Sequence, residues 1–332
     1  MRTPITKRIH GWGRFPTARA LAAVLVSLCV SAPSIRAQAP KLEIEPSNPA
    51  PGALVRVTLS VGTLPDSVTN VSGSMAGEPL HFVAAGEGMW RALGPVPVDG
   101  VDSVWARAIV RRASGSLEAV RSTLPIPPLP PPSITSSPQL AVPERFTRPL
   151  DAATQARIAR ENALARSVGR RAHDSPPRWT GAFLKPRTSR VTSEFGTGRA
   201  FNGALASRHL GVDFAGAVGA PIKAANRGVV ALVDTFFLAG RVIYVDHGAG
   251  IVTGYFHLSE ALVSKGETVE RGQTIGRVGS TGRVTGPHLH WTARYGTMTV
   301  DPLDLVALDT SWYGPQADRA SPPARSSPTG PR

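Results

Sequence analysis

Gly286-Pro287-His288-Leu289-His290-Trp291 sets two histidines two residues apart in an otherwise uncharged run. In an extended strand, residues two apart point to the same face, so both imidazoles are expected to aim into one cleft. The run therefore predicts a β-strand that carries a functional site.

Two other segments offer partners for these imidazoles, His209-Leu210-Gly211-Val212-Asp213 and Tyr255-Phe256-His257-Leu258. The three segments together supply four histidines and one aspartate, with no cysteine nearby. Two imidazoles and one carboxylate suit a divalent cation such as zinc and leave a fourth position for water. Two imidazoles would then remain beside that water, which is typical of a hydrolytic metal site.

The region 178–308 alternates short β-rich runs with glycine-bearing turns. The runs are Arg190–Phe195, Val229–Asp234, Arg241–Asp246, Ile251–His257, Thr274–Val278 and His288–Tyr295. The turn His247-Gly248-Ala249-Gly250 between two apolar runs predicts a hairpin. We expect a compact antiparallel sheet with the metal site on one face, no helix, and Asp301-Pro302 at the end of a strand.

Residues 41–124 show the period-two pattern of half-buried strands. Val55, Val57, Leu59 and Val61 alternate with polar residues, and 104–110 forms a second such run. Several short strands in this length predict a small antiparallel β-sandwich, immunoglobulin-like in type. The fold class is therefore mainly β, and no catalytic chemistry is visible in this first domain.

Residues 125–177 are expected to connect the two β domains. The run 125–132 is rich in proline and predicts a semi-rigid spacer. Asp151 can cap a helix that continues to about Arg171, where helix-forming residues dominate. At the other end of the chain, the Ser/Pro/Arg-rich composition of 309–332 predicts a disordered tail.

The first 37 residues have the pattern of a secretory signal peptide. A basic region ending at Arg19 precedes the apolar run 20–30, and Ala37 offers a cleavage point. The apolar run is too short for a stable membrane span, although an uncleaved anchor is the alternative. Cys29, the only cysteine, would be removed, so the mature chain is predicted to be exported without disulfides, to the periplasm, cell envelope or medium.

The formal charge of +14 falls to +8 once the six basic residues of this segment are removed. That charge could favour adhesion to an anionic envelope polymer or could be a solvated surface without function. Basic residues do not cluster with aromatic ones, so we expect no nucleic-acid partner.

The ordered motifs of 178–308 resemble the lysostaphin/LytM-type zinc metallopeptidase family. They are Thr192-Ser193-Glu194-Phe195-Gly196, His209-xxx-Asp213-Phe214-Ala215, Ala220-Pro221-Ile222, Gly254-Tyr255-Phe256-His257-Leu258-Ser259, Gly272-Gln273-Thr274-Ile275-Gly276, Gly279-Ser280-Thr281-Gly282, Thr285-Gly286-Pro287-His288-Leu289-His290 and Val300-Asp301-Pro302-Leu303. Short patterns of the HxH or HxxxD type are weak alone, whereas the whole series in order is specific.

The resemblance implies one Zn²⁺ per chain, held by His209, Asp213 and His290. It implies that His257 and His288 flank the water and assist catalysis, which agrees with the need for a proton acceptor and donor near neutral pH. It further implies an endopeptidase acting on peptide cross-links or stems of bacterial peptidoglycan. His247, which the family treats as structural, is not assigned a role in the site.

Two other functions remain open from the sequence. Some members of this family have lost zinc ligands and act as cell-wall-binding activators of amidases, although every expected ligand is present here. A lipoyl- or biotinyl-carrier fold is also similar around 269–276, but Lys265 lacks the usual setting of a modified lysine. The N-terminal domain could position substrate, bind a protein partner or shield the cleft, which is an autoinhibitory role.

Overall fold

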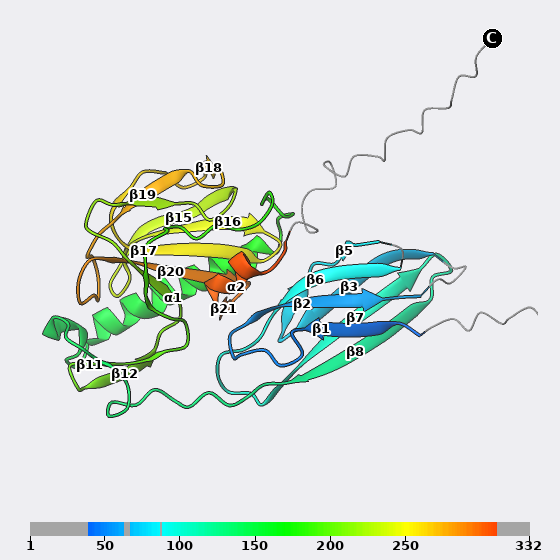
Figure 1. Cartoon of the computed structure of the whole chain (residues 1–332), viewed down its shortest axis with the longest axis horizontal. Coiled ribbons are helices and arrows are strands. Elements are labelled where there is room, and N and C mark those ends of the chain that lie inside the picture. The colour runs from blue at the N-terminus through cyan, green and yellow to red at the C-terminus, as the bar shows by residue number, and fades with distance from the viewer. Residues whose placement is uncertain (1–38, 63–66, 87, 311–332) are drawn as a thin grey trace, which may run out of the picture. The chain divides into compact units, whose positions relative to one another are not determined.

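The computed structural model describes residues 39–62, 67–86 and 88–310 (Figure 1). The predicted signal peptide 1–37 lies outside these residues, as does the predicted disordered tail from 311 onwards. Neither α-helix in the described ranges combines the length and apolarity that crossing a bilayer requires.

Two four-stranded antiparallel sheets form the N-terminal part, as the alternating pattern predicted (Figure 1). The first sheet has the order β1 (Lys41–Glu45), β2 (Leu54–Ser60), β6 (Met89–Pro95) and β5 (Val83–Ala84). The second has the order β4 (Glu78–Leu80), β3 (Val68–Met75), β7 (Ser103–Arg112) and β8 (Leu117–Pro125). Val55, Val57 and Leu59 are fully buried in the core between the two sheets, because alternate residues of β2 face inward.

The segment after the polyproline run binds to the C-terminal part through a short strand. β9 (Gln139–Leu140) pairs in parallel with β11 (Gly198–Phe201), which pairs in turn with β12 (Leu205–Arg208). A 3-10 turn, η1 (Glu144–Phe146), follows β9. Two residues of the predicted connector, Gln139 and Leu140, are therefore paired with backbone of the region 178–308.

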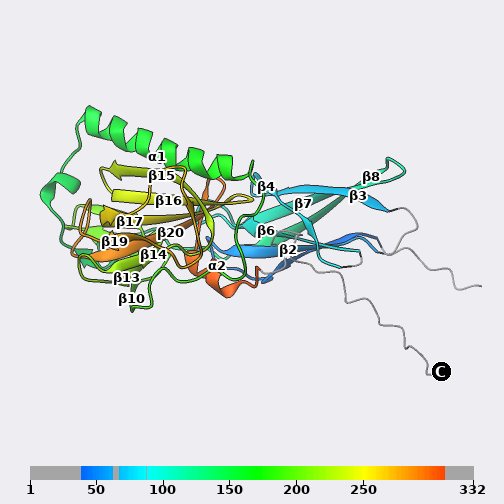
Figure 2. The ribbon, with the colours of Figure 1, turned by 90° about the horizontal axis from the view of Figure 1, so that it is seen from above.

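Helix α1 (Ala152–Ala172) begins and ends close to the predicted residues. The Asp151 side chain accepts a hydrogen bond from the Thr154 amide, which is the expected N-cap interaction. Ala165, Val168 and Ala172 bury a narrow stripe against β15, β16 and β17, and Figure 2 shows the helix running along these strands.

A ten-stranded antiparallel sheet forms the C-terminal part, and each of the six predicted runs overlaps one of its strands. The main path is β10 (Val191–Ser193), β13 (Val212–Ala215), β20 (His288–Tyr295), β17 (Ile251–Ala261), β16 (Gly240–Gly248), β15 (Gly228–Phe236) and β18 (Thr268–Val269). The remaining strands are β14 (Pro221–Lys223), β19 (Thr274–Val278) and β21 (Met298–Val300). The predicted hairpin at 247–250 joins β16 to β17.

The prediction that no helix follows Trp179 is wrong. β21 ends at Val300, and α2 (Pro302–Ala307) begins at the Asp-Pro pair that was expected to end a strand. The Asp301 side chain accepts a hydrogen bond from the Leu303 amide, and Pro302 is the first helical residue, where its missing amide hydrogen costs nothing. Leu305 is fully buried, so tertiary packing stabilises a helix too short to form alone.

Candidate metal centre and active-site cleft

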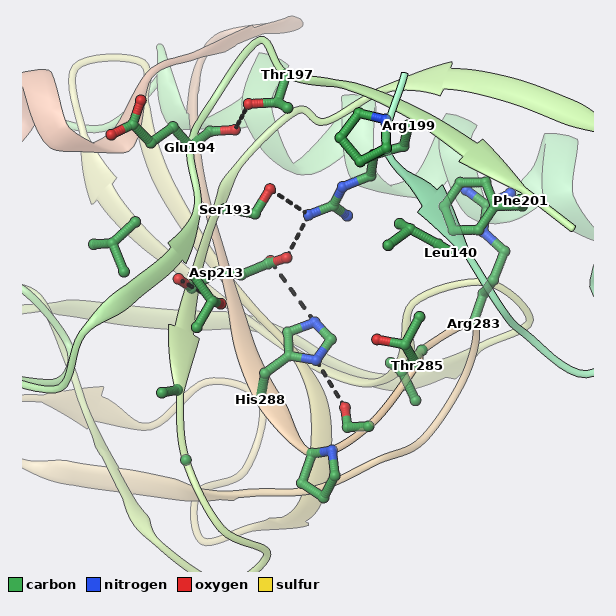
Figure 3. Close-up of a pocket in the computed structure, with 18 of the residues that line it drawn as sticks. Leu140, Ser193, Glu194, Thr197, Arg199, Phe201, Asp213, Arg283, Thr285 and His288 are labelled. Carbon is green, nitrogen blue, oxygen red and sulfur yellow. Dashed lines mark hydrogen bonds and ion pairs between the residues drawn. The ribbon is translucent and has the colours of Figure 1, made fainter. Parts of the chain in front are cut away.

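Adjacent strands bring Asp213, His288 and His290 together. β13 pairs with β20 so that Asp213 lies opposite His290, and β17 places Phe256 on the other side of His290. Leu289 is fully buried, so the two histidines that flank it share the opposite face of β20. The strand predicted from Gly286 to Trp291 thus presents both imidazoles to Asp213, as Figure 3 shows for His288.

His209 reaches the same point from the loop that precedes β13. Its Nδ1 lies 2.8 Å from the Glu194 carbonyl oxygen, and because a carbonyl only accepts, Nδ1 carries a proton. In the neutral ring, Nε2 then carries a lone pair. This atom lies 3.0 Å from Asp213 Oδ1 and 2.8 Å from His290 Nδ1. Several ligand atoms with lone pairs thus point toward one position, as they do around a bound cation.

His209, Asp213 and His290 fit a zinc ion by donor type and spacing. The three potential ligand atoms all lie within 4.8 Å of one another, and His290 Nδ1 is 2.7 Å from Asp213 Oδ1. Two imidazoles and a carboxylate are a usual set for a catalytic zinc site, with a further position left open. The residues present therefore could hold such an ion.

The protonation states of these groups favour metal binding. Burial by itself raises the pKa of the Asp213 carboxyl, but the side-chain contacts with His209 and His290 outweigh it and hold the pKa well below its usual range. Burial lowers the pKa of His290 to about 4, although the carboxylate of Asp213 opposes this shift. At neutral pH the carboxyl is charged and the imidazole is neutral, which are the forms that bind metals.

The two remaining predicted histidines lie beside the three ligand candidates. The ring of His257 is 5.0 Å from the ring of His288 and 5.8 Å from that of His290, measured between centroids. His257 Nδ1 donates to the Thr281 carbonyl at 2.8 Å, and His288 Nδ1 donates to the Gly286 carbonyl at 2.8 Å. Both neutral rings are thereby fixed in the tautomer whose Nε2 can accept a proton, and His288 Nε2 lies 3.7 Å from Asp213 Oδ1.

His247, left outside the predicted site, lies elsewhere and is fully buried. Its Nδ1 donates to the Arg227 carbonyl, and its Nε2 is 2.8 Å from the Thr253 hydroxyl. Both ring nitrogens therefore have protein partners within the core.

Two arginines near the site were missed from the sequence. The Arg199 guanidinium forms an ion pair with Asp213 and donates to the Ser193 hydroxyl at 2.9 Å (Figure 3). The Arg283 guanidinium stacks over the Phe201 ring, 4.1 Å from its centroid. Both follow glycine-bearing turns next to recognisable motifs, but arginine is common in this chain and no spacing pattern distinguishes these two.

A cavity of about 700 Å³ opens beside the metal centre. Asp213 and His288 line one side, and Arg199, Phe201 and Arg283 line the other (Figure 3). Pro138 and Leu140, which come from the segment before α1, complete that second wall. The cavity thus borders Asp213, one of the predicted ligands, and His288.

Comparison with known proteins agrees with this geometry. Residues 207–302 match the model of Peptidase family M23. The chain is 48% identical over 83 residues to the peptidoglycan DD-endopeptidase ShyA of Vibrio cholerae, a match that covers 25% of this chain and 19% of ShyA. It is 41% identical over 113 residues to the DD-carboxypeptidase/endopeptidase Mpg of Neisseria meningitidis, covering 34% of this chain and 26% of Mpg.

One solved structure is similar over a longer stretch. A Pseudomonas aeruginosa protein assigned to peptidase M23 superposes with a TM-score of 0.58 and 28% identity, covering 78% of this chain and 95% of that one. The similarity therefore extends beyond residues 207–302, whereas the matches to ShyA and Mpg concern about a quarter or less of those proteins.

Proposed function

Because residues 207–302 form a Peptidase family M23 domain, we propose that this chain is an exported zinc-dependent endopeptidase that cleaves peptide cross-links or stems of bacterial peptidoglycan. The observation that carries the proposal is one face of a sheet where His209, Asp213 and His290 meet, with His257 and His288 beside them and their Nδ1 atoms donated to backbone carbonyls.

A bound zinc ion would act as a Lewis acid toward the scissile carbonyl and would lower the pKa of a water molecule. The chain itself supplies the proton transfers. His257 and His288, each with Nδ1–H donated to a backbone carbonyl, present Nε2 to take a proton from the attacking water and to return one to the departing amine. Their protonated Nε2–H could also donate to a tetrahedral oxyanion.

Burial keeps the His257 ring neutral. Its pKa is lowered well below the usual value, first by burial and then by the neighbouring His290 and His288. A ring that is neutral at physiological pH is in the form that a general base requires, while the lowered pKa also makes it a weaker proton acceptor than a free imidazole.

The proposed substrate and location follow from the relatives and the N-terminus. ShyA and Mpg are named for endopeptidase activity, and ShyA is named for peptidoglycan. We favour D-Ala–diaminopimelate cross-links over pentaglycine bridges, because ShyA is named a DD-endopeptidase and Mpg a DD-carboxypeptidase/endopeptidase. The signal-peptide pattern of 1–37 supports export to the periplasm or cell envelope.

The test is digestion of purified peptidoglycan by the mature chain and by a His290→Ala variant, with and without chelator. We expect cross-linked muropeptide dimers to disappear and new amino termini to form only with the unsubstituted protein and metal. Mass spectrometry of the products identifies the bond, and elemental analysis of the protein reports the zinc content.

The non-catalytic alternative gives a different result. A wall-binding regulator of amidases would bind peptidoglycan without cleaving it, and chelation would leave that binding unchanged. Absence of zinc from the purified protein, or no cleavage by zinc-loaded protein, would overturn the proposed activity.

A further inference from the structure

The cavity beside the metal centre contains two guanidinium groups and a single carboxylate that faces them. Arg199 and Arg283 both line it. Burial, and secondarily the charge of Arg199, lowers the pKa of Arg283 to about 10. Asp213 pairs with Arg199. Glu194 also lines the cavity, but its carboxylate points away from both arginines in Figure 3.

Arg283 has no acidic partner within the described part of the chain. Among the ion pairs of residues 39–62, 67–86 and 88–310, none includes Arg283, and its aromatic contact is Phe201. Stacking on an aromatic face holds a guanidinium while leaving its hydrogen-bond donors available. A partly buried cation with free donors is suited to a bidentate anion.

The segment before α1 holds this arrangement in place. β9 pairs with Ala200 and Phe201 of β11, and Phe201 packs with Val142 and Phe146. Asn202 also holds this segment through two hydrogen bonds. Its side chain accepts a hydrogen bond from the Val142 amide at 2.9 Å and donates one to the Val142 carbonyl at 2.8 Å. Phe201, and therefore the Arg283 guanidinium, has a fixed position relative to the metal centre.

We infer that Arg283 binds a free carboxylate of the substrate peptide, close to the bond that is cleaved, and so selects carboxylate-bearing peptides over their amides. The inference rests on the proposed function, because it assumes a peptide bound across Asp213 and His288. A planar guanidinium matches a carboxylate with two parallel hydrogen bonds, whereas a carboxamide offers one acceptor and a donor that meets another donor.

The expected discrimination follows from the strength of charge-assisted hydrogen bonds. One such interaction contributes roughly 1.5–3 kcal/mol, which is a preference of about 10- to 150-fold in kcat/KM. The experiment uses two synthetic cross-linked peptides that differ only in a carboxylate or a carboxamide beside the scissile bond. Cleavage and binding of both peptides are measured with the zinc-loaded mature chain.

Three variants sharpen the test. Arg283→Gln should lose the preference, so that the ratio of kcat/KM for the carboxylate peptide to that for the carboxamide peptide falls to about one. Arg283→Lys keeps the positive charge but cannot form two parallel hydrogen bonds to a carboxylate, so it should retain part of the preference. Arg160→Gln removes the same charge from an exposed position on α1 and should behave as the unsubstituted chain.

The outcomes separate this inference from the proposed function. Equal cleavage of both peptides by the unsubstituted chain, or a full preference retained in Arg283→Gln, overturns the inference and leaves the endopeptidase intact. If neither peptide is cleaved, the proposed function fails, and calorimetric binding decides the inference: tighter binding of the carboxylate peptide supports it, and equal or absent binding overturns it.

Discussion

His257 combines a proposed catalytic side chain with an unusual backbone. Its φ is +63°, in the left-handed region that costs a residue with a Cβ about 1–2 kcal/mol, although histidine, asparagine and aspartate tolerate it better than most. The main-chain amide donates to the Ala239 carbonyl at 3.0 Å, and the ring Nδ1 donates to the Thr281 carbonyl at 2.8 Å. The strained conformation aims the ring at His288 and His290 instead of along the regular strand direction.

A His257→Asn substitution separates proton transfer from metal binding, because asparagine tolerates the same backbone conformation but cannot act as a base. We expect the zinc content to remain at one per chain and kcat to fall by about 10²- to 10⁴-fold. His290→Ala should instead lose zinc. Metal analysis and peptide turnover on the same samples check both, and loss of zinc from His257→Asn would contradict its assignment outside the ligand set.

At the scale of elements, α1 is packed against the sheet through small residues. Gly169 lies where the helix meets the turn between β20 and β21, and a Cβ at this position would be 1.8 Å from the Gly296 carbonyl oxygen. Helix propensity alone favours alanine over glycine by about 1 kcal/mol. The close approach of two backbones explains why glycine is needed here in spite of that propensity.

Gly169→Ala should therefore destabilise the protein, because overpacking against a backbone atom costs about 1–3 kcal/mol or more and exceeds the gain in propensity. Asn162→Ala is the control, an exposed position on the same helix where the propensity gain acts without a clash. We expect the midpoint of thermal unfolding to fall by several degrees for the first variant and to stay level or rise for the second. Stabilisation by Gly169→Ala would show that the turn moves freely.

At the scale of the whole molecule, residues far apart in sequence form a buried polar cluster. Glu78 accepts hydrogen bonds from His173 at 2.9 Å and from the Thr297 amide at 2.9 Å, and His81 Nε2 is 2.8 Å from His173 Nδ1. The Tyr295 hydroxyl donates to the Pro79 carbonyl at 2.7 Å beside them. The cluster joins β4, the end of α1 and the β20–β21 turn.

Two pKa shifts in this cluster predict a loss of stability in mild acid. Burial, and secondarily the charge of His173, lowers the pKa of His81 to about 4 from an unfolded value near 6.5. Burial by itself raises the pKa of Glu78, but hydrogen bonds from His173 and Thr297 outweigh it and lower the pKa overall. In both cases the unfolded chain binds more protons, so stability is lost as pH falls below about 6.5 for His81 and below about 4.5 for Glu78.

The measurement is the free energy of unfolding in urea at pH 7.5 and pH 5.0, for the unsubstituted chain and for His81→Gln. Because other buried histidines titrate in the same window, the difference between the two proteins is the informative quantity. We expect the variant to lose less stability on acidification than the unsubstituted chain. An equal loss in both proteins would mean that His81 does not contribute to the pH dependence.

The local pattern of the sequence was sufficient to predict most elements and the shared face of two histidines in the candidate site. Alternation of apolar residues predicted the strands, Asp151 marked the start of α1, and the spacing of His288 and His290 put two imidazoles on one face. These inferences succeeded because strand and helix periodicities are properties of neighbouring residues. Among the described residues, the α-helix that was not predicted is α2, because its six residues carry too little periodicity, although its Asp-Pro start was visible.

Only the tertiary structure decided which other residues surround the site. Arg199 and Arg283 are distant from one another in sequence and have no periodic signature, and they converge because β11 and the loop before β20 border one cavity. The pairing of β9 with β11 and the contact of Glu78 with His173 likewise depend on long-range packing. Residue types and spacing along the chain predicted what chemistry was available, and the folding of separate segments onto one face determined which groups could act together.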